Sequence, residues 1–471
     1  VSKTAFSADM RSTFRERLRH ETKDLKKLFD DRAFEVADGF DTGLELEAWL
    51  VDRNHLPAPE ANAFLAAADD HRIVPELSKF NFEINVDPEP LDGAFLTRLR
   101  ESVELMWRRS ETAAQTCGLS PVMTGILPTV RDEMLQPSWM ADANRYAALN
   151  QELFRLRQDE PLHINIEGVD ALDYRCEHIM LEAACTSLQA HLKINQDDAV
   201  RFYNASVIAS GPLVAASANS PFLYGKSLWA ETRIAAFEQS TRVHGFRDSE
   251  GRNMLRVTLG SGYLRQSFFE LFLENLSYPM LLPALSDDNR YAHLRLQNGT
   301  IWRWNRPILG FGANGAPHLR IEQRVMPAGP SIVDSVANLA LYFGLALALA
   351  RQETPPEQAI SFEDARANFY ACAKDGLHAR LRWAGEDVDV QGLLLKELVP
   401  LAKTALIDAG ADRTDCDYYF DDILHRRLLS GLNGAQWQRD FIDCKGVNYQ
   451  ALTERYVEWQ ATGAPVHTWT V

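Results

Sequence analysis

Residues 43–48 read Gly-Leu-Glu-Leu-Glu-Ala, and this stretch decides how the rest of the chain is interpreted. Side chains of a strand alternate between two faces, so the leucines and the alanine share one face while Glu45 and Glu47 share the other. The apolar face is suited to packing on a core. Glutamate is depleted in strands, which makes two of them on one face unusual. The stretch therefore predicts a half-buried strand that presents carboxylates.

The same alternation recurs further along the chain. It is clearest in residues 79–86, 188–195 and 319–325, and weaker in residues 162–167. A further strand pair is expected over 293–297 and 301–306. The polar faces of these strands carry Lys79, Asn81, Glu83 and Asn85; Gln189, His191, Lys193 and Asn195; Arg320, Glu322 and Arg324; and His163, Asn165 and Glu167.

Alternation by itself leaves two interpretations open. Half-buried antiparallel strands usually turn their polar face to water. A sheet that packs its apolar face on helices and lines a cleft with its polar face explains the same pattern, and it also explains the gathering of carboxylates, a histidine, arginines and amides. Strand alternation alone favours neither.

Helical patterns separate these strands. Residues 7–35 are highly charged, with apolar side chains at helical spacing, and predict an amphipathic surface helix. That pattern fits an oligomer contact and a solvated face equally well, so a homo-oligomer stays open. The apolar residues 331–352 predict a buried helix, because the run is too short to span a bilayer comfortably. Another helix is expected over 363–383.

Composition restricts the classes of function. The chain has 471 residues, of which 46% are hydrophobic and 24% charged, and its net charge is −16. An acidic surface repels nucleic acid and anionic lipid, so we expect neither a nucleic acid nor a membrane as partner. Such a protein still binds ATP where metal ions and local arginines neutralise the phosphates. Six dispersed cysteines without a CxxC pair favour reduced thiols and a cytoplasmic location.

The polar faces offer a set of ligands for a hard cation. Mg²⁺ and Mn²⁺ prefer oxygen ligands and tolerate one imidazole. Clustered carboxylates without a cation would repel one another. Arg320 and Arg324 flank a glutamate at a spacing of two, and arginine forks suit phosphate oxygens. The set therefore suits phosphoryl transfer. The predicted metal ligands are Glu45, Glu47, Glu76, Glu83, His191 and Glu322.

Several other nucleotide and metal enzymes are excluded by motif. The chain contains no GxxxxGK[ST], no kinase-type glycine-rich loop followed by His-Arg-Asp, and no HExxH, and its twelve histidines are dispersed.

Five sequence motifs occur in order between residues 43 and 324. Together they identify a protein family far more specifically than any one of them alone. They are Gly43-Leu44-Glu45-Leu46-Glu47; Glu76-Leu77-Ser78-Lys79-Phe80 running to Glu83; Thr186-Ser187-Leu188-Gln189-Ala190-His191; Ser217-Ala218-Asn219-Ser220-Pro221-Phe222; and Arg320-Ile321-Glu322-x-Arg324. A weaker sixth is Asn433-Gly434-Ala435-x-x-Gln438. Together they resemble the glutamate–cysteine ligase type 2 family and its carboxylate–amine ligase relatives, over roughly residues 40 to 440.

The resemblance implies an α+β fold like the glutamine-synthetase catalytic domain. In that fold a curved, mainly antiparallel sheet of about six strands forms a funnel backed by helices. The resemblance also divides the chain into a helical extension (1–36), a catalytic domain (37–444) and a C-terminal tail (445–471). The sequence around Arg233 and Lys374 departs from the family pattern. The resemblance therefore supports the ATP and metal half of the site more strongly than the half that takes the amine.

The activity implied is an ATP- and Mg²⁺-dependent (or Mn²⁺-dependent) ligase of glutathione biosynthesis. A carboxylate, expected to be glutamate or an analogue, attacks the γ-phosphate of ATP. The acyl phosphate then reacts with cysteine or another amine. Arg320, Arg324 and Glu83 are the predicted catalytic residues. Lys79, Gln189, Arg233 and Asn219 are candidates for orienting substrate or nucleotide.

Each assignment has a structural alternative. Arg320 can pair with Glu322, Lys79 can be a solvated strand residue, and Asn219 can belong to a turn. Glu76 lies seven positions from Glu83, an odd offset that puts the two on opposite faces of one continuous strand. Two other classes of function remain: a guanidino-type phosphotransferase in the same funnel, and a binding protein without turnover on this fold.

Overall fold

Six strands form the central antiparallel sheet. The computed structural model describes residues 6–243, 246–247, 251, 254–283 and 290–471. The strands lie in the order β11-β12-β8-β1-β3-β2, and two short strands, β4 and β5, pair with β1. The predicted curved antiparallel sheet of about six strands is therefore confirmed. The bounds are β1 Asp41–Val51, β2 Ile73–Pro75, β3 Asn81–Asn85, β4 Glu89–Pro90, β5 Ser120–Val122, β8 Ser187–Ile194, β11 Asn305–Phe311 and β12 Pro317–Pro327.

The strand register places the predicted polar residues next to one another on one face. Across β1 and β3, Glu47 lies opposite Glu83, and across β12 and β8, Glu322 lies opposite His191. Glu45 has Gln189 on one side and Asn85 on the other. Residues from four strands that are distant in sequence thus converge on a single surface of the sheet.

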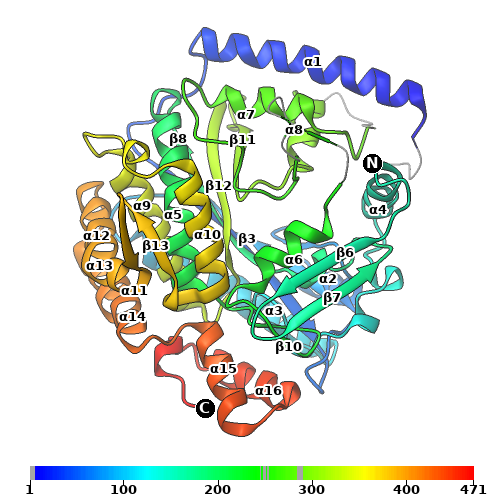
Figure 1. The fold of residues 1–471 in the computed structure, drawn as a ribbon, viewed down its shortest axis with the longest axis vertical. Helices are drawn as coiled ribbons and strands as arrows, with labels where there is room; N and C mark the ends of the chain where they lie inside the picture. Colours follow the sequence, from blue (N-terminus) through cyan, green and yellow to red (C-terminus); the bar gives the residue numbers. More distant parts are fainter. Residues whose placement is uncertain (1–5, 244–245, 248–250, 252–253, 284–289) are drawn as a thin grey trace.

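The other face of the sheet carries the core. Leu46, Leu188 and Ile321 are fully buried there. Helices α5 and α9 pack together behind the sheet, with α3, α10 and α12 around them (Figure 1). Helix α9 is long and apolar enough to cross a membrane by length and composition, but most of it is buried inside the protein, as predicted for a core helix. The bounds are α3 Phe95–Thr116, α5 Ala199–Ser217, α9 Ile332–Ala350, α10 Phe362–Asp375 and α12 Val399–Asp408.

The two ends of the chain pack on opposite sides of this body (Figure 1). Helix α1 (Ala8–Asp30) lies along α7 (Phe269–Glu274) and α8 (Ala292–Gly299). Its Glu21 binds the His293 ring at 2.6 Å, so α1 fixes the position of α8. At the other end, Tyr456 and Gln460 of α16 (Tyr449–Ala461) donate hydrogen bonds to the Met123 carbonyl at 2.9 and 3.0 Å.

The remaining elements are short connections or peripheral pieces. The helices are α2 Ala61–Ala68, α4 Asn144–Leu156, α6 Thr232–Ser240, α11 Val390–Leu393, α13 Arg413–Asp417, α14 Arg426–Ser430 and α15 Gly434–Lys445. The strands are β6 Leu162–Glu167, β7 Ala171–Cys176, β9 Phe222–Leu223, β10 Lys226–Ser227, β13 Arg380–Trp383 and β14 Glu386–Asp389.

Two expectations about local structure were wrong. The strand expected at 293–297 is helix α8, since a short apolar run fits a helix and a strand equally well, and β11 begins only at Asn305. The helix expected over 363–383 ends at Asp375, where Gly376 has a φ of 58°. The weaker strand predicted at residues 162–167 is confirmed as β6, which forms a separate hairpin with β7 and exposes its polar face to solvent.

Candidate active site

The polar face of the sheet borders two adjoining cavities. The larger has a volume of about 1020 Å³ and the smaller of about 310 Å³. Glu45, Gly299 and Arg306 line both of them. The cleft interpretation of the strand alternation is thus the one that holds for the central sheet.

Glu45, His191 and Glu322 form a trio at the junction of the cavities. The His191 Nε2 atom lies 3.1 Å from a Glu45 oxygen and 3.8 Å from a Glu322 oxygen. Adjacent strands β1, β8 and β12 supply one residue each, and their side chains point the same way because of the strand register. Gly43 lies opposite His191 in the register, so no side chain from that position covers the imidazole.

Glu47, Glu76 and Glu83 form a second trio in the smaller cavity. Glu47 accepts hydrogen bonds from the Ser187 backbone at 2.7 Å and from the Gln189 amide at 2.8 Å. Glu76 joins the other two because it directly follows β2, a separate strand that pairs with β3. The odd offset between Glu76 and Glu83 is therefore no obstacle, since a turn separates the two strands.

The second trio is electrostatically strained. Burial, reinforced by the Glu47 carboxylate, raises the pKa of Glu76 to about 8. Burial, followed by the charges of Glu45, Glu76 and Glu47, holds the pKa of Glu83 well above its usual range. Burial also raises the pKa of Glu47, although the Arg324 guanidinium opposes it. Three carboxylates share one space without enough positive charge to stabilise them.

The first trio differs because it has cationic partners. Burial disfavours the Glu322 carboxylate, but Arg306 and then Arg324 outweigh it and hold its pKa far below the usual range. Arg306 binds Glu322 through two hydrogen bonds of 2.6 and 2.8 Å. For Glu45 burial is likewise the largest influence, but the hydrogen bond from His191 lowers the pKa overall.

The two trios fit divalent cations. Within each trio the ligand atoms lie within 4.8 Å of one another, which is the spacing of donors around one ion. One trio offers only carboxylate oxygens and the other two carboxylates with one imidazole, and such donors suit Mg²⁺ or Mn²⁺. The raised pKa values of Glu76 and Glu83 show that their charged forms are disfavoured, and a bound cation would stabilise those forms.

Arg320 and Arg324 lie on the same strand but line different cavities. Arg324, in the smaller cavity, binds Glu322 at 3.1 Å and also the Gln189 side chain. Arg320 lines the larger cavity, and its buried Nε atom has no hydrogen-bond partner among the described residues. The pairing of Arg320 with Glu322 that the sequence left open does not form; Arg306 and Arg324 hold Glu322 instead.

The larger cavity combines apolar and cationic walls. Phe272, Leu294, Ile308 and Phe311 supply apolar surface. The basic residues include Lys193, Arg295, Arg306, His318 and Arg320, and Glu35, Asp41, Glu45 and Glu322 add carboxylates. Burial, and then the charges of Arg320 and Lys193, lower the pKa of His318 to about 4, so its ring is neutral at physiological pH. A ligand with an apolar part and several negative charges matches these walls when a cation bound at Glu45 and Glu322 balances the carboxylates.

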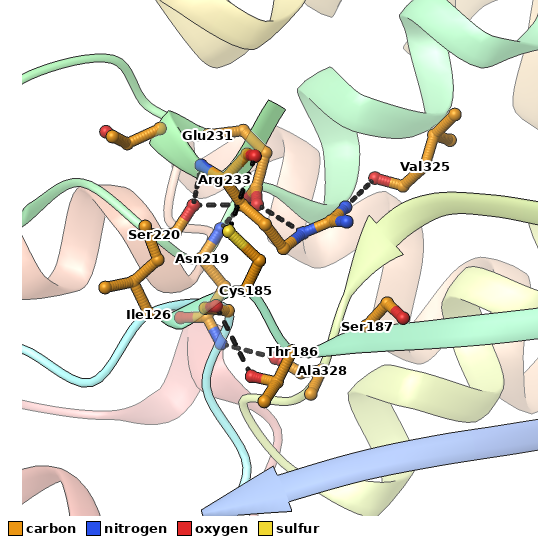
Figure 2. A network of polar contacts seen from close by, with 12 residues as sticks. Ile126, Cys185, Thr186, Ser187, Asn219, Ser220, Glu231, Arg233, Val325 and Ala328 are labelled. Carbon is orange, nitrogen blue, oxygen red and sulfur yellow. Dashed lines mark hydrogen bonds and ion pairs between the residues drawn. The ribbon is translucent and has the colours of Figure 1, made fainter. Parts of the chain in front are cut away.

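The remaining predicted site residues fall in different places. Gln189 lines the smaller cavity, whereas Lys79, Asn219 and Arg233 line neither of these two cavities. The Lys79 ammonium pairs with Asp142 at 2.8 Å near the surface. Asn219 and Arg233 belong to a buried network together with Ser220 and Glu231 (Figure 2).

Several cavity residues were not assigned a role from the sequence. Arg306 lies at the end of the strand predicted over 301–306, and the pairing predicted for that strand was wrong. Glu182, Arg145 and Tyr146 line the smaller cavity from segments outside the sheet. Strand alternation carries no information about such segments. The signal that identifies Glu182 is its position beside Glu76 and Glu47 in the smaller cavity, which only the fold reveals.

Comparison with known proteins agrees with this geometry. A model of glutamate-cysteine ligase family 2 matches residues 42–458. No functionally curated protein matches the chain at a significant level. The crystal structure of a glutamate–cysteine ligase from Francisella tularensis in complex with AMP has a TM-score of 0.51 at 10% identity, covering 93% of this chain and 96% of that one. A bifunctional glutathione synthetase from Pasteurella multocida has a TM-score of 0.49 at 12% identity, covering 90% of this chain and 53% of that one. At such identities the likeness to these structures concerns the fold alone.

Proposed function

Because the chain belongs to glutamate-cysteine ligase family 2, we propose that it is an ATP-dependent ligase that joins a carboxylate to an amine. The observation that carries the proposal is the pair of carboxylate trios at the junction of two cavities. One cavity matches a nucleotide in size and charge, and the other is large enough for small substrates. Such an enzyme would act in the cytoplasm on small molecules.

The reaction begins with ATP in the larger cavity and the acid in the smaller one. The acid carboxylate attacks the γ-phosphorus of ATP, which forms an acyl phosphate and releases ADP. The neutral amine then attacks the acyl carbon and phosphate leaves, so that an amide forms and the amine loses a proton to solvent. Glutamate is the expected acid, and cysteine or another amino acid the expected amine.

The residues of the chain supply charge and position. Arg320, which no described side chain neutralises, binds phosphate oxygens from the larger cavity. Arg324 is held in place by Glu322 and Gln189 and faces the smaller cavity, so it stabilises negative charge on the group in transfer. Arg306 keeps Glu322 charged and oriented at the junction.

Both trios would hold Mg²⁺ or Mn²⁺. Glu45, His191 and Glu322 would hold one ion, and Glu47, Glu76 and Glu83 would hold the other. The ions would neutralise phosphate oxygens and polarise the phosphorus toward attack.

The test is release of ADP and phosphate by the purified protein with MgATP and L-glutamate, with and without a pool of amino acids and small amines. We expect both products to depend on the amine and to be lost in Glu45→Gln. ADP without free phosphate, together with a stable phosphorylated product, would instead identify a phosphotransferase. Failure to bind MgATP and to turn over would refute the enzyme proposal and leave a binding protein.

A further inference from the structure

Helix α1 lies outside the residues 42–458 that the family model matches, yet it is packed into the protein. Its Phe14, Leu18 and Leu25 side chains are buried, and the helix lies along α7 and α8. The contacts of α1 are therefore a property of this chain rather than of the segment that the family model matches.

Glu21 of α1 binds the first turn of α8 through both carboxylate oxygens. Its Oε2 atom accepts a hydrogen bond of 2.8 Å from the Leu294 backbone N–H, and its Oε1 atom lies 2.6 Å from Nδ1 of the His293 ring. The first N–H groups of a helix have no acceptor within the helix. Within the described residues, Tyr291 at the N-cap provides no side-chain acceptor. Glu21 thus takes the place of a cap, and its charge complements the helix dipole.

These contacts are shielded from water. Only 8% of His293 and 18% of the Glu21 side chain are exposed. The Phe14 ring packs edge-on against the His293 ring, with 5.1 Å between the ring centres. A shielded N–H that loses its acceptor is costly, because water does not readily replace the lost hydrogen bond. Removal of the Glu21 carboxylate should therefore loosen the start of α8.

Helix α8 forms part of the wall of the larger cavity. Four of its residues line that cavity: Leu294, Arg295, Asn298 and Gly299. Leu294 therefore connects the two sides, since its backbone binds Glu21 and the residue borders the cavity. Burial is the largest influence that lowers the pKa of Arg320, and the charges of Arg295 and Arg306 act in the same direction. These three guanidiniums thus lie near one another around the cavity.

The C-terminal end of α8 contacts Arg306 and the strand that carries it. The Gly299 carbonyl accepts a hydrogen bond of 3.4 Å from the Arg306 guanidinium, and the Asn298 amide donates one of 2.7 Å to the Pro307 carbonyl of β11. Arg306 in turn holds Glu322 of the first trio. A continuous series of contacts therefore runs from α1 through α8 to the first trio.

We propose that Glu21 is a positioning residue for the nucleotide cavity. It fixes the start of α8, and α8 holds Arg295 near Arg320 and supports Arg306. Glu21 itself does not touch the ligand, whose identity as MgATP rests on the proposed ligase function. When α8 is loosened, a smaller fraction of the molecules has the binding-competent cavity, and the apparent affinity falls by that fraction.

The experiment combines two measurements on the full chain. One is calorimetric binding of a non-hydrolysable ATP analogue in Mg²⁺, and the other is steady-state turnover with MgATP, L-glutamate and the amine pool. Glu21→Ala should raise the Kd of the analogue and the KM for ATP about 10-fold, as expected for a lost helix cap. Both kcat at saturating ATP and the KM for the acid should stay within about a factor of two, since Glu21 contacts no reacting group. Glu21→Gln should have a smaller effect, because its amide oxygen still accepts from Leu294.

Two control variants separate positioning from a general loss of stability. Glu16→Ala removes a carboxylate from the exposed side of α1 and should behave as the wild type. Val399→Ala removes buried methyl groups from α12, which packs on α9 and lines neither cavity. It should lower the melting temperature and leave the Kd of the analogue unchanged.

The proposal is overturned if Glu21→Ala binds the analogue as tightly as the wild type, or if Val399→Ala weakens binding as much as Glu21→Ala does. A wild type that binds the analogue without any turnover would refute the ligase proposal, while the Kd values would still decide the role of Glu21. A wild type that binds no nucleotide would refute both.

Discussion

Two polar clusters lie in this protein, one open to the cavities and one closed off from them. The open cluster consists of the two carboxylate trios with Arg306 and Arg324 beside the cavities. The closed cluster consists of Asn219, Ser220, Glu231 and Arg233 (Figure 2). Both contain residues from the motifs that resemble the ligase family. Polar motif residues can therefore serve either chemistry or architecture.

Hydrogen bonding distinguishes the two clusters. In the closed cluster Glu231 accepts from Asn219 at 2.8 Å, from Ser220 at 2.7 Å and from Arg233 at 3.0 Å. Arg233 also donates to the Val325 carbonyl, and Gln438 donates to Asn219 at 2.9 Å. The network thus joins β12, α6 and α15. In the open cluster, by contrast, no described group donates a hydrogen bond to the Glu76 carboxylate, and its pKa is raised.

The first and largest expected effect tests the closed cluster. Arg233→Met leaves Glu231 buried without its cation, so we expect the free energy of unfolding to fall by about 3–5 kcal/mol. Burial already raises the pKa of Glu231 against the opposing charge of Arg233, and the variant would raise it further. Unfolding in guanidinium chloride, at constant pH, measures the change.

A double variant separates pairing from packing. Arg233→Met combined with Glu231→Gln removes both charges, and it should recover part of the lost stability. The folded fraction of either variant should keep the KM for ATP and for the acid within about a factor of three, since Arg233 lines neither cavity. A normal stability with a greatly raised KM would instead make Arg233 a substrate residue.

The second prediction tests the open cluster. Glu83→Gln keeps the shape of the side chain and removes one of three mutually repelling carboxylates. We expect turnover to fall by about 100- to 1000-fold, because metal binding and charge stabilisation are both weakened, while stability without metal is unchanged or higher. Steady-state kinetics at varied Mg²⁺, together with thermal melting, provides the measurement. Glu101→Gln, on the exposed side of α3, is the matched control.

If Glu83→Gln loses stability as strongly as Arg233→Met, the contrast between the clusters is false. If it keeps full turnover, the second trio is not part of the active site.

Strand alternation predicted the open cluster because the information is local. Once β1, β3, β8 and β12 are strands with apolar inner faces, Glu45, Glu83, His191 and Glu322 must share the opposite face. The sequence could not predict the neighbours of these residues, since strand order and register are set by the whole sheet. For the same reason Arg306 was not recognised as the partner of Glu322.

The closed cluster escaped prediction for a different reason. Asn219 and Gln438 are 219 positions apart, and nothing in either segment indicates that they meet. Gly434 explains the contact afterwards, because a side chain there would collide with Asn219. Arg233 resembled a substrate residue in its motif, although it is almost completely buried and its guanidinium lies over the Trp304 ring. Burial, which decides between the two roles, is a property of the fold.

The smallest expected effect concerns pH and metal together. In the metal-free protein Glu76 has a pKa of about 8, against an ordinary value of 4.5. Between these values the folded state retains a proton that the unfolded state has lost, so the free energy of unfolding falls as the pH rises from about 4.5 to about 8. We expect a loss of about 1–2 kcal/mol, less than the full shift implies, because water in the cavity screens the charge.

Mg²⁺ should reverse this loss, since the cation favours the charged carboxylates. Thermal melting with EDTA or with Mg²⁺ at pH 5 and pH 8 should therefore show a larger stabilisation by Mg²⁺ at pH 8. Glu76→Gln isolates the contribution, because it removes the titrating group and should flatten the metal-free pH dependence. If the metal-free stability of the wild type and of this variant depended equally on pH, the open cluster would not be strained. The distinction between the two clusters would then rest on the hydrogen bonds alone.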